Sequence, residues 1–544
     1  MNLSRIASWC IVSTLLALGV APGLNHAMAF QPRPQDAEEG VEVLTRGPVH
    51  EAFAETISFD PEPGIVVAKA APESIEELPP EQKPDGANVA WIPGYWGWDD
   101  ERSDFLWGSG IWRALPPGRQ WMPGYWGKSG GDSQWTSGYW ADAKESEVEY
   151  LPEPPATVEV GPNVAAPSAN HIWLPGSWVW NQSRYAWRPG YWGMAQPNWV
   201  WIPAHYVWAP RGYVYIDGYY DYSIARRGVL FAPVYINANV YSRSGFSYSP
   251  MIVINPAVFA SHLFLRPSYG HYYFGDYYAT NYSSSGFSPW FSFTSSRYGY
   301  DPFYAQQRWQ NRNDQQWNSR VEADFANRRD HEEARPPRTW AAQRDHSTQS
   351  ATKSDKSFVV AASLDELVKS KDASIRFRPV AKEERERISQ RGQEIRTARD
   401  ERKTLEAAAA DPSPGESVRI TKPVKVKLPR TPIMAQPVER IDKDDAPPKA
   451  IEAPQPDVKI EPKPRKPRGN AEPNKAEPKV PKVDTKPEPP KGKPNVEPKP
   501  IPRGEPRPEL PKVEPKPAPK KEPKPERPKA EPKSPKANRE RNVS

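Results

Sequence analysis

Residues that could carry metal or acid–base chemistry are scattered along this sequence rather than grouped. The eight histidines stand at positions 26, 50, 171, 205, 262, 271, 331 and 346, and no H-E-x-x-H motif or other paired metal-ligand spacing occurs. His331-Glu332-Glu333 lies in a charged segment with helical spacing, where a solvated helix face is a simpler interpretation than a ligand set. We therefore expect no bound metal and no cofactor.

Motifs for nucleophilic or phosphate chemistry are also missing from the sequence. It contains no G-x-S-x-G elbow and no glycine-rich phosphate loop. Glycoside hydrolysis would need two carboxylates across a cleft, which sequence spacing alone does not test. Acidic residues such as Asp99-Asp100-Glu101 stand at turn positions, where Asp is favoured because its side chain bonds to the local backbone. We predict that the protein is not an enzyme; an uncharacterised hydrolase is the least favoured alternative.

Tryptophan is the residue type whose spacing is most informative. Of the 22 tryptophans, 17 lie between Trp91 and Trp208. Six-residue units close to W-x-P-G-Y-W begin at 91, 107, 121, 135, 173, 187, 201 and 215, a step of 14 after a first step of 16, with one longer step of 38 between 135 and 173. A fixed step of this kind indicates a repeat architecture. The repeat-defining residues are Trp91, Pro93, Gly94, Trp96, Trp121, Pro123, Gly124, Trp126, Trp173, Pro175, Gly176, Trp178, Trp187, Pro189, Gly190 and Trp192.

These aromatic rings have two possible roles, and the sequence leaves both open. Large rings bury roughly 150–250 Å² each, so Trp pairs could stabilise a thin sheet that lacks a deep core. Exposed rings in register could instead form a ligand platform that stacks on sugars, and Trp98, Trp180 and Trp208 are the candidates for it. An exposed row of rings would favour binding, whereas a closed aromatic core would favour packing.

The composition of the units predicts β-strands. Trp, Tyr, Val and Ile dominate them, and turn clusters such as Asn181-Gln182-Ser183-Arg184 separate them. The central Pro-Gly is either a tight turn, with the two Trp of one unit opposite each other, or a bulge within one strand of ~10 residues. We predict a mainly β fold, an antiparallel Trp/Tyr-rich meander or barrel-like domain, followed by one or two helices and a long disordered tail rich in Pro, Lys and Glu.

The rest of the chain divides by composition. Residues 1–29 have a basic start, an apolar stretch and an Ala27-Met28-Ala29 cleavage site, which is typical of a secretory signal peptide. The only cysteine, Cys10, would leave with this peptide, so the mature chain has no disulfide. The later segments are an extended acidic linker at 30–88, the repeats at 89–220 with an insertion at about 141–169, a continuing aromatic β region at 221–305, a helix at 306–345, a linker at 346–381, a charged helix at 382–410 and a disordered tail at 411–544.

Charge dominates the last two segments. In the charged helix, Ile388 and Ile395 recur at seven among dense Arg and Glu, so a solvated single helix is the expected state rather than a coiled coil. Residues 411–544 contain 33 basic and 21 acidic residues, a net charge of +12, and almost no apolar side chains. Such a segment is expected to be disordered with polyproline II character. Because its positive charge is interleaved with Glu and the protein is expected to be exported, we expect envelope polymers rather than nucleic acid as its partners.

The intact W-x-P-G-Y-W copies resemble the WXXGXW/YXWGXW repeat family of exported bacterial proteins. The resemblance is specific over 91–220 and departs from the pattern at Trp107 and Trp135, where Ser replaces Pro, and at Ala204, which replaces Gly. The stretch from Tyr215 to about Trp340 is similar to the downstream region found with these repeats in planctomycete-type proteins. That family has no established activity. The resemblance therefore implies a β-repeat fold and an envelope location, and it carries over no catalytic residue.

Together these features predict a non-enzymatic, exported cell-envelope protein. We expect it to be periplasmic, outer-membrane-associated or extracellular, with no transmembrane segment after signal cleavage. The repeats would be a structural or interaction module and the tail a basic tether. The alternative is a module that binds carbohydrate or a cell-wall polymer through exposed Trp. The possible partners are envelope polymers or other envelope proteins, and the oligomeric state is left open.

Overall fold

The structure of the chain is a computed structural model. It describes residues 39–293, 299–349, 358–370, 375–407, 420–427, 430–437, 446–457 and 459–461, all of which belong to one unit, Met1–Glu477. The expected signal peptide at 1–29 lies outside the described residues, as does the expected disordered tail from 462 onward.

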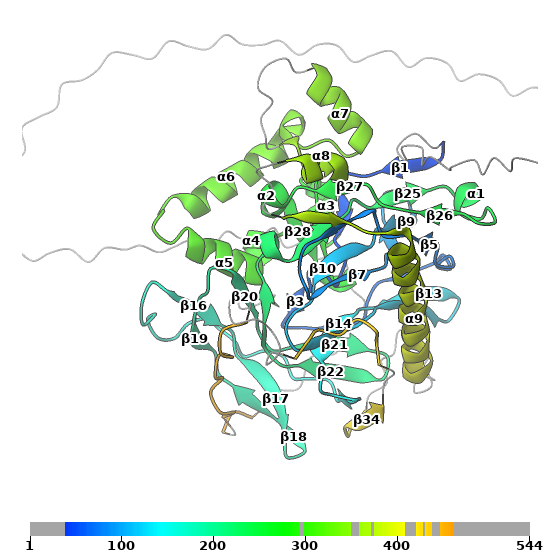
Figure 1. Cartoon of the computed structure of the whole chain (residues 1–544). Helices are drawn as coiled ribbons and strands as arrows, with labels where there is room; N and C mark the ends of the chain where they lie inside the picture. Colours follow the sequence, from blue (N-terminus) through cyan, green and yellow to red (C-terminus); the bar gives the residue numbers. More distant parts are fainter. Residues whose placement is uncertain are drawn as a thin grey trace, which may run out of the picture. The chain divides into compact units, whose positions relative to one another are not determined.

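Two consecutive repeats fold into one long antiparallel hairpin. In the first hairpin β7 (Val89–Ile92) pairs with β10 (Ile111–Ala114), and β8 (Tyr95–Asp99) pairs with β9 (Asp104–Gly108). Three further hairpins repeat this order and are numbered second to fourth along the chain (Figure 1). Their strands are β11 (Arg119–Met122), β12 (Tyr125–Ser129), β13 (Asp132–Thr136) and β14 (Tyr139–Asp142); β16 (His171–Leu174), β17 (Ser177–Asn181), β18 (Arg184–Arg188) and β19 (Tyr191–Met194); and β20 (Trp199–Ile202), β21 (His205–Ala209), β22 (Gly212–Ile216) and β23 (Tyr219–Tyr222).

The central Pro-Gly neither reverses the chain nor adds an extra residue to one strand of the pair. In the first hairpin Ile92 faces Ile111 and Tyr95 faces Gly108, so two residues are left out of the ladder on each strand. We call this matched interruption the kink. It differs from both geometries considered from the sequence, because a turn would pair residues within one unit and a bulge would add a residue to one strand only.

The regular spacing of the aromatic residues is explained by pairing between units. The first aromatic residue of one unit faces the second of the other, with ring centroids 4.8–5.4 Å apart. Such edge-on and tilted contacts are favourable for aromatic rings. The pairs are Trp91 with Trp112, Trp96 with Trp107, Trp121 with Trp140, Trp126 with Trp135, Trp173 with Trp192, Trp178 with Trp187, Trp201 with Tyr220 and Tyr206 with Tyr215.

The mainly β, antiparallel prediction is confirmed, but the barrel-like alternative is wrong. In the part of the chain that the structure describes, the strands form thirteen small sheets of two to four strands, and these do not close. Each kink divides its hairpin into two short ladders, which prevents one continuous sheet. Other segments extend the hairpins at their edges: β24 (Gly228–Leu230) pairs with β10, β4 (Val66–Val67) with β13, and β15 (Glu147–Leu151) with β22.

The segment before the repeats is part of the folded structure and does more than connect to the repeats. Its short strands each pair with a strand far along the sequence, so the expected linker at 30–88 carries paired backbone at intervals. These strands are β1 (Val41–Val43), β2 (Gly47–Pro48), β3 (Ile57–Ser58), β4, β5 (Glu76–Glu77) and β6 (Gln82–Pro84); their partners are β25 (Val234–Ile236), β29 (His271–Phe274), β31 (Gly299–Tyr300), β13, β26 (Ser247–Tyr248) and β33 (Phe377–Pro379), in that order.

After the repeats the chain alternates short strands with short helices. The remaining strands are β27 (Ile252–Ile254), β28 (Leu263–Arg266), β30 (Ser288–Pro289) and β32 (Ala361–Ser363). The helix expected at 306–345 is divided into several, because Pro336-Pro337 and polar turns interrupt it. The helices are α1 (Ala238–Tyr241), α2 (Pro256–Phe259), α3 (Thr280–Ser284), α4 (Trp290–Phe293), α5 (Pro302–Gln310), α6 (Trp317–Asp330), α7 (Trp340–Gln349) and α8 (Leu364–Lys369).

The charged helix α9 (Lys382–Ala407) lies against the repeats and contacts β12 (Figure 1). A single helix forms, as expected, but it is not solvated on all sides, since Gly392, Ile395, Ala398, Arg402 and Glu406 are buried. Arg402 and Glu406 belong to this buried stripe, although a heptad pattern places only apolar residues in a buried stripe. For this reason the sequence pattern did not predict the contact. None of the described helices is long and apolar enough to span a bilayer.

Residues 411–544 are expected to be disordered, but several of the described residues in this segment pack against the fold. β34 (Val424–Lys427) pairs with β15 in an antiparallel ladder. Further along, Ile433 and Ala435 are 1% and 3% exposed. Isolated Val and Ile residues between prolines are enough for this docking because the backbone supplies the hydrogen bonds.

Candidate functional site

A glycine lies opposite a tryptophan ring at each kink, and this contact explains the W-x-x-G spacing. A Cβ atom on Gly110 would stand 2.5 Å from Cζ2 of Trp91, and one on Gly190 would stand 2.4 Å from Cζ2 of Trp173. The same relation holds for Gly124 with Trp135, Gly138 with Trp121, Gly176 with Trp187 and Gly218 with Trp201. The first ring of each unit therefore occupies the space where a side chain would be on the glycine of the paired unit.

Ala204, the departure from the repeat noted in the sequence, fits this rule. It stands in the fourth hairpin at the position of the glycine, and its paired unit begins with Tyr215 instead of Trp. A phenol ring is smaller than an indole, so a methyl group is tolerated there.

A buried glutamate closes the first kink. The carboxylate of Glu77, from β5, accepts hydrogen bonds from the backbone N–H of Gly94 (2.7 Å), the N–H of Gly110 (2.9 Å) and Nε1 of Trp107 (3.0 Å). Because the kink leaves these glycine N–H groups out of the ladder, the carboxylate supplies the acceptor that the missing strand pairing would have given.

Glutamates occupy the second and third kinks in the same way. Glu51 accepts from the N–H of Gly138 (3.0 Å) and from Nε1 of Trp135 (2.9 Å). Glu159 accepts from the N–H of Gly176 and from Nε1 of Trp173 (3.1 Å). Sequence reasoning missed all three. One signal was present: Glu77 and Glu159 each stand 17 residues before the first glycine of their hairpin.

Burial changes the acidity of these carboxylates. It raises the pKa of Glu51 to about 8 and that of Glu77 to about 7, while the N–H donors partly oppose the shift. A raised carboxyl pKa is also a mark of general acids. Here the side chains are 2% and 3% exposed, and their oxygens already accept hydrogen bonds from the fold itself. They therefore hold structure together and do not face a substrate cleft.

The second kink is bound from its other side by α9. Arg402 donates from Nη1 to the carbonyl oxygens of Pro123 (2.9 Å) and Ser137 (3.1 Å). Its Nε donates to Glu406 (2.9 Å), which also accepts from the hydroxyls of Tyr125 and Tyr150, both at 2.7 Å. Arg402 and Glu406 are both fully buried. Thus Glu51 satisfies N–H groups of this kink while Arg402 satisfies its carbonyls.

A second buried ion cluster joins the first and fourth hairpins. Asp221 of β23 accepts from Nη2 of Arg113 of β10 through both oxygens (2.7 and 2.6 Å), and Arg227 lies 2.9 Å away. All three side chains are nearly inaccessible to solvent. Paired burial of this kind makes each partner indispensable, since removal of one leaves an uncompensated charge.

The three candidate platform residues do not form one exposed row. Trp98 on β8 is half-buried against Phe105, with centroids 5.2 Å apart. Trp180 on β17 is half-buried against Tyr185, at 4.9 Å. Trp208 on β21 is 7% exposed and belongs to an aromatic cluster that Trp180 also contacts. The structure brings Trp180 and Trp208 into one cluster and leaves Trp98 in another.

Among the four hairpins, the third has the most solvent-accessible tryptophan side chains. Trp173, Trp180 and Trp192 are half-buried, and Met194 is 55% exposed. In the first two hairpins, by contrast, the paired tryptophans are all buried. The third hairpin therefore presents aromatic surface that the others use as core.

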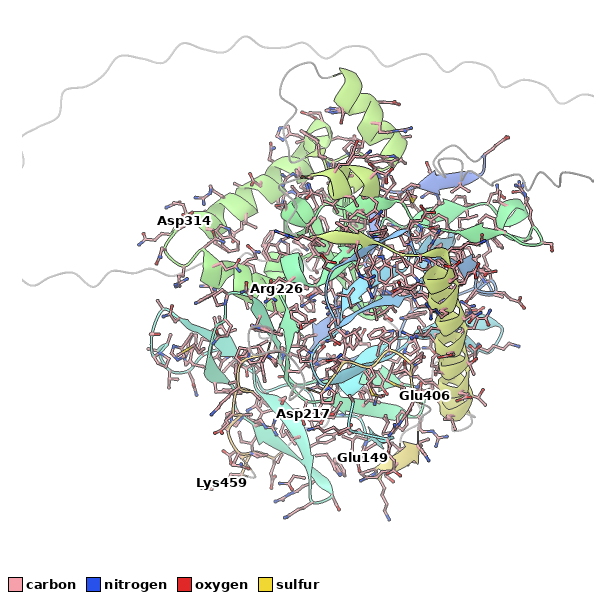
Figure 2. The ribbon with its side chains drawn as sticks, in the orientation of Figure 1. Glu149, Asp217, Arg226, Asp314, Glu406 and Lys459 are labelled. Carbon is pink, nitrogen blue, oxygen red and sulfur yellow. The ribbon has the colours of Figure 1, made fainter. Side chains whose placement is uncertain are left out.

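Part of the C-terminal segment lies on this hairpin (Figure 2, near the label of Lys459). The backbone N–H of Asp457 donates to the carbonyl of Trp187 at 2.5 Å. Ile460 packs against the cluster that contains Trp178 and Trp187, and the side chain of Ile451 lies over Gly193.

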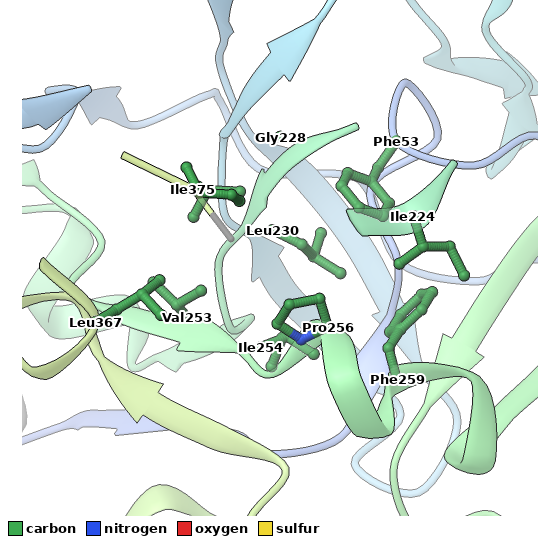
Figure 3. Close-up of a pocket in the computed structure, with 11 residues that line it drawn as sticks. Phe53, Ile224, Gly228, Leu230, Val253, Ile254, Pro256, Phe259, Leu367 and Ile375 are labelled. Carbon is green, nitrogen blue, oxygen red and sulfur yellow. The ribbon is translucent and has the colours of Figure 1, made fainter. Parts of the chain in front are cut away.

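Two cavities in the described part of the chain differ in size and lining. The first holds about 30 Å³, far less than a small-molecule site needs, and apolar residues line it, including Phe53, Leu230 and Phe259 (Figure 3). It is a packing void. The second holds about 350 Å³, within the range of small-molecule sites. Its lining combines aromatic rings with polar groups, among them Trp290, Trp317, Phe325, Gln307, Gln310 and Asp324.

The histidines that the structure describes serve local contacts. Burial lowers the pKa of His50 and His205 to about 4 and that of His271 to about 3. Each has a backbone carbonyl partner, from Pro93, Pro203 and Tyr269 in that order. No group of three or more metal-ligand side chains is found among the described residues.

The fold and its kinks define a class: a mainly β repeat protein whose structural unit is a pair of W-x-x-G repeats in one hairpin. Residues 86–113, 121–141, 169–192 and 197–221 match the WXXGXW repeat family, each as two copies. The chain thus carries WXXGXW repeats, as expected, and each two-copy match falls on one hairpin. Neither a curated protein nor a solved structure matches the chain.

Proposed function

We propose that this chain is a non-enzymatic, exported cell-envelope protein whose repeats form a structural and interaction module. The observation that supports it best is the contrast between the hairpins. The first two bury all of their paired tryptophans, whereas the third leaves Trp173, Trp180 and Trp192 partly accessible. An accessible aromatic face on a rigid scaffold suits association with a partner.

The absence of catalysis is part of this proposal. The acidic groups whose pKa burial raises most, Glu51, Glu55, Glu77 and Asp301, are hydrogen-bonded within the fold. A general acid needs access to the atom that it protonates. These groups support a scaffold role instead.

Export is tested by expressing the full chain in a bacterial host with an envelope. We expect the mature protein in the envelope fraction, with Phe30 as its first residue. Retention of residues 1–29, or accumulation in the cytosol, would reject the location. Association is tested by co-sedimentation of the purified chain with isolated envelope material, where a Trp180→Ala chain should be retained less than the wild type.

A second candidate is binding of carbohydrate or cell-wall polymer. The second cavity favours it, because aromatic rings beside amide and carboxylate groups suit a sugar. Titration of cell-wall oligosaccharides, followed by Trp fluorescence, tests it with two variants. Loss of a saturable signal in Trp317→Ala would locate the ligand in the cavity, and loss in Trp180→Ala would locate it on the third hairpin. No saturable signal with any oligosaccharide rejects this candidate.

A further inference from the structure

Strand edges in the hairpins and in the neighbouring strand β15 accept extended segments from the C-terminal part of this chain. Val424–Lys427 pairs with β15, next to the fourth hairpin. On the second hairpin, the N–H of Trp121 donates to the carbonyl of Ile433 (2.9 Å), and the N–H of Ala435 donates to that of Arg119 (2.8 Å). On the third hairpin, Asp457 donates to Trp187. Three separate segments therefore use one mode, addition of backbone to a free edge.

These segments share a sequence pattern. Each begins after a proline, at Pro423, Pro432 and Pro456, and places one or two apolar side chains shortly afterwards. A proline cannot donate to a ladder, so it limits the added strand to a few residues at an edge. It also pre-sets an extended backbone, which lowers the entropy lost on docking.

The three contacts differ in how firmly they are held. Four residues of β34 are in register with β15, and Ile433 and Ala435 are buried on the second hairpin. On the third hairpin one backbone bridge, between Asp457 and Trp187, is formed by the described residues, and Ile451 and Ile460 are half-buried. The third contact is thus the one that can be replaced with the smallest loss of packing.

We propose that the third hairpin is a receptor for proline-flanked extended polypeptide, and that its partner is residues 446–461 of a second copy of this chain, in exchange with its own. This rests on the proposed interaction function and names its partner class. The receptor is the edge of β18 at Trp187 with the aromatic cluster of Trp178 and Tyr185, which Ile460 contacts. Aromatic surfaces are well suited to proline-rich extended segments.

The chain's own residues 446–461 compete with those of a second copy for the third hairpin. A tethered segment acts at an effective concentration on the order of millimolar, so it outcompetes a free copy in dilute solution. Weakening the tethered segment should open the receptor without altering the hairpin. Asp457→Pro does this, because it removes the N–H that donates to Trp187.

The test measures fluorescence anisotropy of a labelled peptide with the sequence of residues 446–461 added to full-length chains. We expect saturable binding to the Asp457→Pro chain, at least about tenfold tighter than to the wild type. A Gln455→Pro chain is the matched control, since Gln455 is an exposed neighbour, and it should behave like the wild type. A peptide that itself carries proline at 457 should not bind.

Equal binding to the wild-type and Asp457→Pro chains, or no saturable binding to either, would overturn the proposal. Ile460→Asp in the full chain is a second way to open the receptor and should give the same increase, which guards against a folding defect specific to one variant. Co-sedimentation with envelope material is a separate measurement. If it succeeds while the peptide fails to bind, the interaction function survives and only the partner class is rejected.

Discussion

The indole of Trp107 lies over Gly94, so close that a Cβ atom on Gly94 would stand 2.7 Å from Nε1 of the ring. The same glycine donates its N–H to Glu77, which also accepts from Trp107. One residue without a side chain thus allows a ring, a carboxylate and two strands to meet. This three-way contact explains why the repeat motif requires a glycine at this position.

Gly94→Ala should destabilise the protein strongly. The methyl group would meet the carbonyl oxygen of Gly108 at 2.3 Å as well as the ring of Trp107, so strands must separate. We expect a loss of about 3 kcal/mol in the free energy of unfolding, measured by denaturant titration. Gly131→Ala is the control: nothing lies within 4 Å of its Cβ position, and its effect should be small. Similar losses in the two variants would contradict the steric explanation.

The exception in the fourth hairpin can be tested with a double-mutant cycle. Tyr215→Trp alone should destabilise the protein, because the indole would meet the methyl group of Ala204. Addition of Ala204→Gly should recover part of the loss, with a favourable coupling energy on the order of 1 kcal/mol. Strictly additive effects in denaturant titrations would show that the two positions do not share this space.

Removal of a kink carboxylate should lower the stability of the protein. Glu77→Ala leaves the N–H groups of Gly94 and Gly110 and the indole of Trp107 without their acceptor. We expect a loss of about 3 kcal/mol in unfolding free energy. Glu76→Ala, a change at the exposed neighbour on the same strand, should alter stability by no more than about 0.5 kcal/mol. Equal effects would mean that the loss arises from the strand and not from the kink.

The contact between α9 and the second kink should be essential for holding the helix in place. Arg402→Met leaves the carboxylate of Glu406 buried without its cation, which typically costs about 3–5 kcal/mol. We expect limited proteolysis to cleave α9 in this variant before the repeats are cut. Glu401→Ala changes an exposed residue of the same helix turn and should retain the wild-type pattern. An unchanged pattern in Arg402→Met would show that other contacts hold α9.

Stability should pass through a maximum at mildly acidic pH. The pKa values of Glu51 and Glu77 rise from 4.5 to about 8 and 7 in the fold, so their stabilising effect is complete below about pH 4.5 and is lost as pH rises through 7 to 8. The pKa values of His50 and His271 fall from 6.5 to about 4 and 3, so their effect is complete above about pH 6.5 and is lost as pH falls toward 4 and 3.

Denaturant midpoints measured from pH 4 to 9 would therefore be highest between about pH 5 and 6.5. Glu77→Gln should flatten the alkaline side of this profile, because it removes one of the titrating groups. A profile that rises steadily from pH 5 to 8 would contradict the assigned shifts.

Much of the local structure could be predicted from residue types. Rings of Trp and Tyr at a step of 14 predicted strands, and Pro-Gly predicted an interruption of each strand, because both follow from the side chain and backbone of the residues concerned. Residue type alone also makes Trp98, Trp180 and Trp208 candidates for an exposed ligand platform. The structure distributes them over two clusters, since ring exposure depends on what covers each hairpin.

The tertiary structure alone decided which groups complete the kinks. Glu51 reaches Gly138 across 87 residues of sequence, and Arg402 reaches Pro123 across 279. No periodicity links such positions, because the requirement is only that a buried N–H or carbonyl find a partner, wherever in the chain that partner stands. The sequence by itself determined the repeating strands and the backbone groups that they leave unpaired. Only the tertiary structure decided that glutamates, an arginine and proline-flanked segments are the partners of those groups.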